Sequence, residues 1–339
     1  MNFTKKLTII FLIAFSNFSI GQQRIKGIDY SYFQLKNKKD TIDFVVADTA
    51  FNAVKPIFLF CQGSQPIPLF LEIKGRNPFP LSLSNFDINK IEKHYYVVEI
   101  SMPKTPLIVG FNHLDKSYNY VRDTSQENSY LSDYLKSNYL DNYVQRANQV
   151  INYLRHQKWV NKQKLIVAGH SQGAQVAVCI AASNKKVTKL GLFGYDPHNR
   201  IGIEIRQARK DAENGKITWA EADSITSAQY EFYKEVQNKD SVQKYPSLIG
   251  DKSFSQSTLD KLINLNIPIY IAYGSNDIIA DFCDLIPLYF IEKHKTNLTR
   301  IRYPNLGHNF FPIDKNGKRD YSRAQWKFVM NQFVTWTLK

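Results

Sequence analysis

The segment VAGHSQGAQVA places Ser171 between two glycines, Gly169 and Gly173. The apolar run 165–167 before it is short enough for a buried strand, and the alanine-rich run 174–183 after it is long enough for a buried helix. A strand that becomes a helix within about two residues strains the residue at the junction, and its neighbours two positions away must be nearly free of side chain. The spacing therefore predicts a serine exposed as a nucleophile on a sharp strand-to-helix turn.

A histidine near the C-terminus is the predicted base, because a serine hydroxyl needs a base that a third group orients. His308 lies in YPNLGHNFF, a loop directly after a predicted strand, with Gly307 before it. His294, in IEKHKTN, is predicted at a helix end on the surface, and the side chain of His170 should point away from the serine hydroxyl. We therefore expect His308 to be the base, in the chain order Ser, Asp or Glu, His.

Two aspartates compete for the acid that orients this histidine. Asp277 lies in YGSND, just past a predicted strand and the turn 274–276. Catalytic groups gather at the carboxyl ends of parallel strands, so Asp277 is the expected acid. Asp196, in FGYDPHN after the preceding predicted strand, could also reach the histidine and stays open as the alternative.

Two backbone amides are expected to stabilise the oxyanion of the transition state. One is the N–H of Gln172, at the positive end of the helix that follows the nucleophile. The other is the N–H of Ser64, which follows the apolar strand 56–61 in the stretch PIFLFCQGSQPIP. An ordinary glycine turn at Gly63 is the alternative, and the order of the parts favours the oxyanion site.

Predicted strands and helices alternate along the chain, which is typical of an α/β fold with a mostly parallel sheet covered by helices on both faces. One clear amphipathic helix is predicted at 139–154, and a helix at 322–338 closes the fold. The strand-like runs lie at 41–47, 56–61, 95–100, 164–168, 189–193, 268–272 and 298–303.

One region interrupts this alternation with two helices in 201–237, and we expect it to be a helical cap inserted at about 197–240. Gly215 is suited to end the first helix, and Thr218 with Glu221 forms a capping box for the second. Because loops at strand carboxyl ends carry function, a cap over the site is favoured over a surface decoration. Some of its large side chains should then face Ser171; these are Trp219, Ile225, Phe232 and Tyr233.

Length and charge narrow the class of protein. The chain has 339 residues, is 43% hydrophobic and carries a formal net charge of +14. Its lysines and arginines are scattered and no nucleic-acid motif accompanies them, so no nucleic-acid partner is expected. The cysteines Cys61, Cys179 and Cys283 show no metal-ligand spacing and are expected to be buried free thiols, with no metal site.

The N-terminus has the pattern of an export signal. Lys5 and Lys6 precede the apolar block 7–15, which is too short to span a membrane. Ser19 and Gly21 supply small residues for a signal peptidase, so residues 1–21 are the predicted signal peptide. The remaining domain, 22–339, is expected to be periplasmic or extracellular without a stable membrane anchor; an uncleaved anchor is the alternative.

The stretches CQGS, GHSQGA, YGSND and LGHNFF together resemble the α/β-hydrolase superfamily, in its esterase and serine-aminopeptidase-like branches. The resemblance extends from about residue 56 to the C-terminus. It implies an α/β-hydrolase fold with an eight-stranded, mostly parallel sheet flanked by helices and a helical cap. This sequence departs from the usual His-Gly of the oxyanion loop, where it has Gln62.

These features predict an exported serine hydrolase that cleaves a carboxylic ester, or a small amide or peptide, without a cofactor. Ser171 would attack the carbonyl, His308 would move the proton and Asp277 would hold the imidazolium. The expected partner is therefore a small-molecule ester or amide substrate. An acyltransferase with the same triad and a non-catalytic binding protein on the same fold are the alternatives.

Overall fold

A computed structural model describes residues 20–36, 40–126, 128–314 and 317–339. The predicted signal peptide, 1–21, lies outside the described residues except for its last two. In the described ranges, no helix combines the length and the apolar character that crossing a membrane requires.

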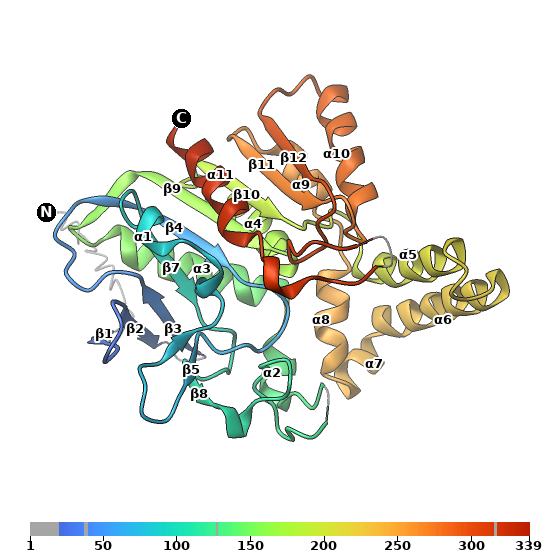
Figure 1. The fold of residues 1–339 in the computed structure, drawn as a ribbon, viewed down its shortest axis with the longest axis horizontal. Coiled ribbons are helices and arrows are strands. Elements are labelled where there is room, and N and C mark those ends of the chain that lie inside the picture. Colours follow the sequence, from blue (N-terminus) through green and yellow to red (C-terminus); the bar gives the residue numbers. More distant parts are fainter. Residues whose placement is uncertain (1–19, 37–39, 127, 315–316) are drawn as a thin grey trace, which may run out of the picture.

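A nine-stranded sheet forms the centre of the molecule (Figure 1). Its strands, in spatial order, are β1 (Ile20–Arg24), β2 (Ser31–Lys36), β3 (Thr41–Val46), β7 (Tyr96–Ile100), β4 (Lys55–Cys61), β9 (Val160–His170), β10 (Lys189–Phe193), β11 (Ile269–Gly274) and β12 (Leu298–Tyr303). The six strands from β7 to β12 are parallel, and β1, β2 and β3 join antiparallel. The resemblance implied eight strands in this sheet, whereas the described residues form nine.

Helices cover both faces of this sheet because successive side chains of each strand point to opposite faces. Ile57 and Leu59 of β4 join the core under one helical layer, whereas Phe58 and Phe60 join the core on the other face. The first layer contains α3 (Leu140–Arg155), α4 (Gln172–Ser183), α8 (Ser247–Phe254), α9 (Leu259–Asn264) and α10 (Ala280–Glu292). The second contains α1 (Ile88–Ile91) and α11 (Trp326–Leu338). The three cysteines are unpaired, and Cys179 and Cys283 are buried.

A second, three-stranded sheet lies between β4 and β9 in the sequence. It consists of β5 (Phe70–Glu72), β6 (Phe79–Pro80) and β8 (Ile108–Gly110), and the helix α2 (Ser132–Ser137) follows it. The sequence did not predict these strands, because two or three residues show no periodicity. Residues 62–118 of this part of the chain provide one wall of the site described below.

The expected helical hairpin is present as α5 (Arg200–Glu213) and α6 (Trp219–Gln237), followed by α7 (Lys239–Lys244). Thr218 and Glu221 form the predicted capping box, and Gly215 has φ +69° after α5. The two helices pack on each other through a small apolar seam and project from the sheet (Figure 1). Trp219 is 53% exposed and Ile225 is 40% exposed.

Candidate active site

Ser171 occupies a strained turn between β9 and α4. Its φ of 55° and ψ of −123° lie outside the ordinary regions for a residue with a side chain. Its N–H donates to the Phe193 carbonyl oxygen at 2.8 Å, which ties the turn to β10. A Cβ on Gly169 would lie 2.1 Å from the Gly173 carbonyl oxygen. The spacing of the two glycines therefore reflects direct backbone contact within the turn.

The start of α4 packs on the loop after β4, where the expected oxyanion donors lie. A Cβ on Gly173 would be 2.1 Å from the Cys61 carbonyl oxygen and 2.4 Å from that of Gln62. Neither the Gln172 N–H nor the Ser64 N–H donates to another described residue. Both amides are therefore available to a ligand, and they come from two segments in close contact.

His308 and Asp277 form a hydrogen-bonded pair. The distance from His308 Nδ1 to Asp277 Oδ2 is 2.8 Å, and the Asp277 side chain is completely buried. Asp277 Oδ1 accepts from the Ile279 N–H at 3.2 Å, which fixes the carboxylate. Since Nδ1 faces the carboxylate, the proton of a neutral imidazole lies on Nδ1 and Nε2 remains an acceptor. The His308 side chain is 30% exposed and lines the same pocket as Ser171.

Ser171 Oγ and His308 make no hydrogen bond within 3.5 Å in the described structure. Such bonds are often long in the absence of substrate and tighten in the reacting complex. The two side chains line the same pocket.

Asp196 does not contact His308. Its Oδ1 accepts from the His198 N–H at 2.9 Å, and its buried Oδ2 has no partner among the described residues. Burial, and in addition the charge of Asp277, raises the pKa of Asp196 to about 6. The geometry thus places Asp277, and not Asp196, on the histidine.

His170 anchors the loop that carries His308. Its Nε2 donates to the His308 carbonyl oxygen at 3.0 Å, and its ring packs edge-on against Trp326 at 4.9 Å between centroids. Burial lowers the pKa of His170 to about 3, so the ring is neutral and keeps the proton for this bond. His294 follows α10 and does not line the pocket.

Two glycines whose contacts were not predicted from the sequence shape the site. Gly194 has φ +54°, and a Cβ there would lie 3.1 Å from His308 Nδ1 and 3.4 Å from Asp277 Oδ2. A Cβ on Gly274 would lie 2.0 Å from the Leu306 carbonyl oxygen in the loop that carries His308. Both glycines end or directly follow a predicted strand, in LGLFG and IAYG, and that position was the available signal.

The pocket around Ser171 has a volume of about 740 Å³, within the roughly 300–1,000 Å³ that small-molecule sites span. It is lined by Phe60, Gln62, Gly63, Ser64, Gln65, Ile67, Leu81, Ser82, Asn85, Phe86, Ser117, Tyr118, His170, Ser171, His308, Asn309, Phe311 and Trp326. No residue of the hairpin is among them. The expectation that Trp219, Ile225, Phe232 and Tyr233 face Ser171 is therefore not met, because the hairpin projects outward.

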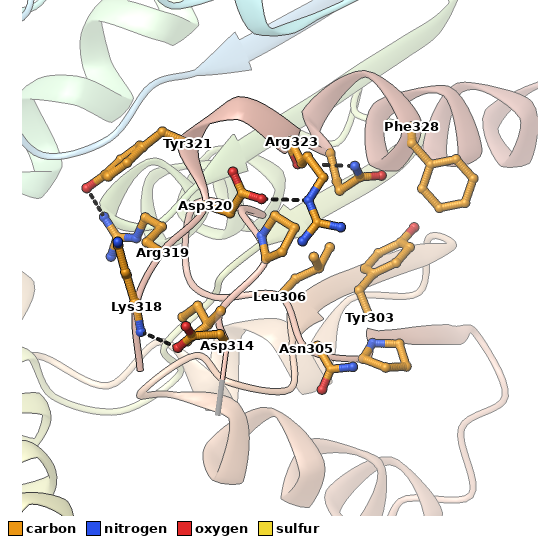
Figure 2. A pocket seen from close by; sticks show the side chains of 14 residues that line it. Tyr303, Asn305, Leu306, Asp314, Lys318, Arg319, Asp320, Tyr321, Arg323 and Phe328 are labelled. Atoms are coloured by element: carbon orange, nitrogen blue, oxygen red, sulfur yellow. Dashed lines mark hydrogen bonds and ion pairs between the residues drawn. The ribbon is translucent and has the colours of Figure 1, made fainter. Parts of the chain in front are cut away.

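A larger cavity, about 1030 Å³, lies among residues of the segment 303–328 (Figure 2). Its polar side chains are largely paired: Arg323 Nε binds Asp320 Oδ2 at 2.6 Å, and Arg319 donates to the Tyr321 hydroxyl at 3.3 Å. Neither Ser171 nor His308 lines it. The groups able to do acyl chemistry therefore face the smaller pocket.

The order of the three residues along the chain and their positions in the sheet identify the fold. Ser171, Asp277 and His308 follow β9, β11 and β12, at the carboxyl ends of parallel strands of one sheet, and the serine lies on a strand-to-helix elbow. The chain has the α/β-hydrolase fold.

The sequence matches no protein-family model and no curated protein. Three solved structures illustrate its structural similarities, each at low identity. Acetyl xylan esterase 1 from Thermoanaerobacterium sp. JW/SL YS485 is 12% identical, with a TM-score of 0.48 over 94% of this chain and 87% of that one. The thioesterase domain from the curacin biosynthetic pathway is 13% identical, with a TM-score of 0.47 over 95% of this chain and 100% of that one. The acylaminoacyl peptidase of Pyrococcus horikoshii is 11% identical, with a TM-score of 0.46 over 87% of this chain and 38% of that one.

Proposed function

We propose that the protein is a serine hydrolase that cleaves a carboxylic ester through an acyl-enzyme. The observation that carries this proposal is the shared pocket of Ser171 and His308, together with the 2.8 Å bond from His308 Nδ1 to buried Asp277. A strained serine, a histidine with a free Nε2 and a buried carboxylate are the three groups that nucleophilic acyl transfer needs.

The geometry supports the following sequence of steps. Ser171 Oγ attacks the ester carbonyl as His308 Nε2 takes its proton, and Asp277 stabilises the imidazolium. The amides of Gln172 and Ser64 donate to the oxyanion. The acyl C–O bond then breaks and the imidazolium protonates the departing alcohol. A water molecule releases the acyl group by the same route, giving the carboxylic acid and free Ser171.

An ester is favoured over a peptide with a free amino terminus. Binding of an α-ammonium group normally requires a carboxylate, and no Asp or Glu lines the pocket in the described structure. A small neutral amide remains the second candidate, because its acyl chemistry is the same.

Labelling with a fluorophosphonate probe, followed by a panel of p-nitrophenyl esters of increasing acyl length, tests the proposal. The wild-type protein should be labelled at Ser171, and Ser171→Ala should lose labelling and on the order of a million-fold in kcat. Ser183→Ala, at the opposite end of α4, is the matched control and should be labelled normally.

Three results would contradict the proposal. Labelling of Ser171→Ala at another serine would move the nucleophile. A wild-type protein that is folded but unlabelled would indicate a binding protein. Transfer of the acyl group to added alcohol or amine in preference to water would indicate an acyltransferase.

Export is proposed on the sequence pattern of residues 1–21. Mass spectrometry of the native protein should then find Gln22 as the first residue, which leaves 22–24 to pair with β2. An intact Met1 in the membrane fraction would show an uncleaved anchor.

A further inference from the structure

Among the described residues that line the pocket around Ser171, none is Lys, Arg, Asp or Glu. Charged residues make up 22% of this chain. At that proportion about four of the lining residues would be charged, so their absence from the lining is a distinct feature of the pocket. Two buried carboxyls lie beside residues of the pocket wall: Asp277 is hydrogen-bonded to His308 at 2.8 Å, and Glu99 lies near Ser82. The burial of Glu99 raises its pKa to about 8, so it is mostly protonated at neutral pH. The described lining thus holds no Lys, Arg, Asp or Glu in a chain of net charge +14.

Neutral hydrogen-bonding groups replace the missing charges. They come from four separate segments and comprise Gln62, Ser64, Gln65, Ser82, Asn85, Ser117 and Asn309. The side chains of Ser64, Ser117 and Asn309 form no hydrogen bond with another described residue, so they are available to a bound molecule. Each hydroxyl and each amide both donates and accepts, which is also the capacity of an alcohol group.

Aromatic rings lie between these polar groups. Phe86, Tyr118, Phe311 and Trp326 line the pocket, and the Tyr118 ring is 45% exposed. A ring face packs against apolar C–H surface, whereas the neighbouring amides and hydroxyls pair with O–H groups. A molecule that carries C–H surface and several hydroxyls side by side fits such a wall.

We propose that the ester substrate has a neutral, polyhydroxylated alcohol part, as in an O-acyl carbohydrate. This rests on the proposed function of Ser171, His308 and Asp277. The acyl C–O bond breaks, the sugar oxygen takes the proton from His308, and water supplies the hydroxyl of the acid. An ester with a phosphate or carboxylate group would find no opposite charge among the residues that line the pocket and would lose part of its hydration.

Three acetate esters that share the acyl group test this inference. They are 6-O-acetylglucose, cyclohexylmethyl acetate, which keeps the ring but lacks the hydroxyls, and 4-(acetoxymethyl)cyclohexanecarboxylate, which keeps that ring and carries a negative charge. We expect kcat/KM for the sugar ester to exceed each of the others at least about tenfold, since a single unpaired hydrogen-bonding group costs about a factor of ten. Equal or lower values for the sugar ester would overturn the inference.

Two further measurements separate this inference from the proposed function. Fluorophosphonate labelling of Ser171 and turnover of p-nitrophenyl acetate report only on the nucleophile. If both are present while the sugar ester is not preferred, the carbohydrate inference falls and the hydrolase stands; if labelling is absent, both fall. In Ser117→Ala, the ratio of kcat/KM for the sugar ester to that for cyclohexylmethyl acetate should fall about fivefold. An unchanged ratio would count against a sugar at this wall.

Discussion

Replacement of Gly194 by alanine should disturb the His308–Asp277 pair directly. Gly194 has φ +54°, and the added Cβ would lie 3.0 Å from His308 Cε1 and 3.1 Å from Nδ1. Ordinary contacts of this kind begin near 3.4 Å, so the imidazole must move by about 0.4 Å. It cannot move toward Asp277, because Nδ1 and Oδ2 are already 2.8 Å apart.

The expected loss of rate follows from this displacement. A misplacement of about 1 Å can cost roughly a hundredfold in rate, so about 0.4 Å corresponds to roughly a sixfold loss in kcat. A non-glycine residue in the left-handed region also costs about 1–2 kcal/mol of stability. KM for a small ester should change less than kcat, because Gly194 does not line the pocket.

Gly215→Ala is a matched control. Gly215 has φ +69°, and nothing lies within 4 Å of the added Cβ. Both variants should therefore lose a similar free energy of unfolding in urea, whereas only Gly194→Ala should lose kcat for p-nitrophenyl acetate and the rate of fluorophosphonate labelling. If the two folded variants keep the same activity, a Cβ at residue 194 does not displace the His308 ring, which would contradict the 3.0 Å contact.

Further expectations concern the acids and the hairpin. Asp277→Asn should lower kcat on the order of ten-thousand-fold and Asp196→Asn less than tenfold; the opposite order, in steady-state kinetics, would transfer the role. The folded-state pKa of Glu99, about 8, lies above its usual 4.5, so its contribution to stability is present below pH 4.5 and is lost as the pH rises through 8. Urea unfolding at pH 5 and pH 9 should show that Glu99→Gln removes on the order of 4 kcal/mol of this pH dependence, and an unaltered dependence would contradict the burial of a carboxyl there. Replacement of residues 209–231 by a short Gly/Ser loop should leave labelling and ester preference unchanged, and a changed preference would show that the hairpin reaches the substrate.

The strands that carry the site could be predicted from sequence because each is a buried apolar run bounded by turn residues. The run 189–193 coincides with β10, and 298–303 coincides with β12. β1, β2 and the small sheet were not predicted: β1 and β2 contain few consecutive apolar residues, and the strands of the small sheet are only two or three residues long. Their pairing partners decide that they are strands, and a single sequence does not show these partners.

The site residues were predictable where local structure identifies them. The strained serine needs small neighbours within its own segment, so Gly169 and Gly173 appear in the sequence beside it. Gly194 and Gly274 serve contacts with a loop more than thirty residues further along the chain. Those contacts exist only after the sheet has formed, so the sequence shows that each glycine stands near the end of a strand but not which residue it contacts.

The wall of the pocket comes from a part of the chain that the sequence pattern did not single out. The hairpin holds large exposed side chains such as Trp219, yet its helices bury mainly alanine against each other and point away from Ser171. The polar and aromatic groups of the pocket come instead mainly from the segment 62–118, from the loop after β12 and from Trp326 at the start of α11. In the first of these, the short strands β5, β6 and β8 fix the loops that carry Ser82 and Ser117. Under the proposed function, the segment between β4 and α3 would therefore determine which alcohol lies beside Ser171, while the sheet determines where Ser171 lies.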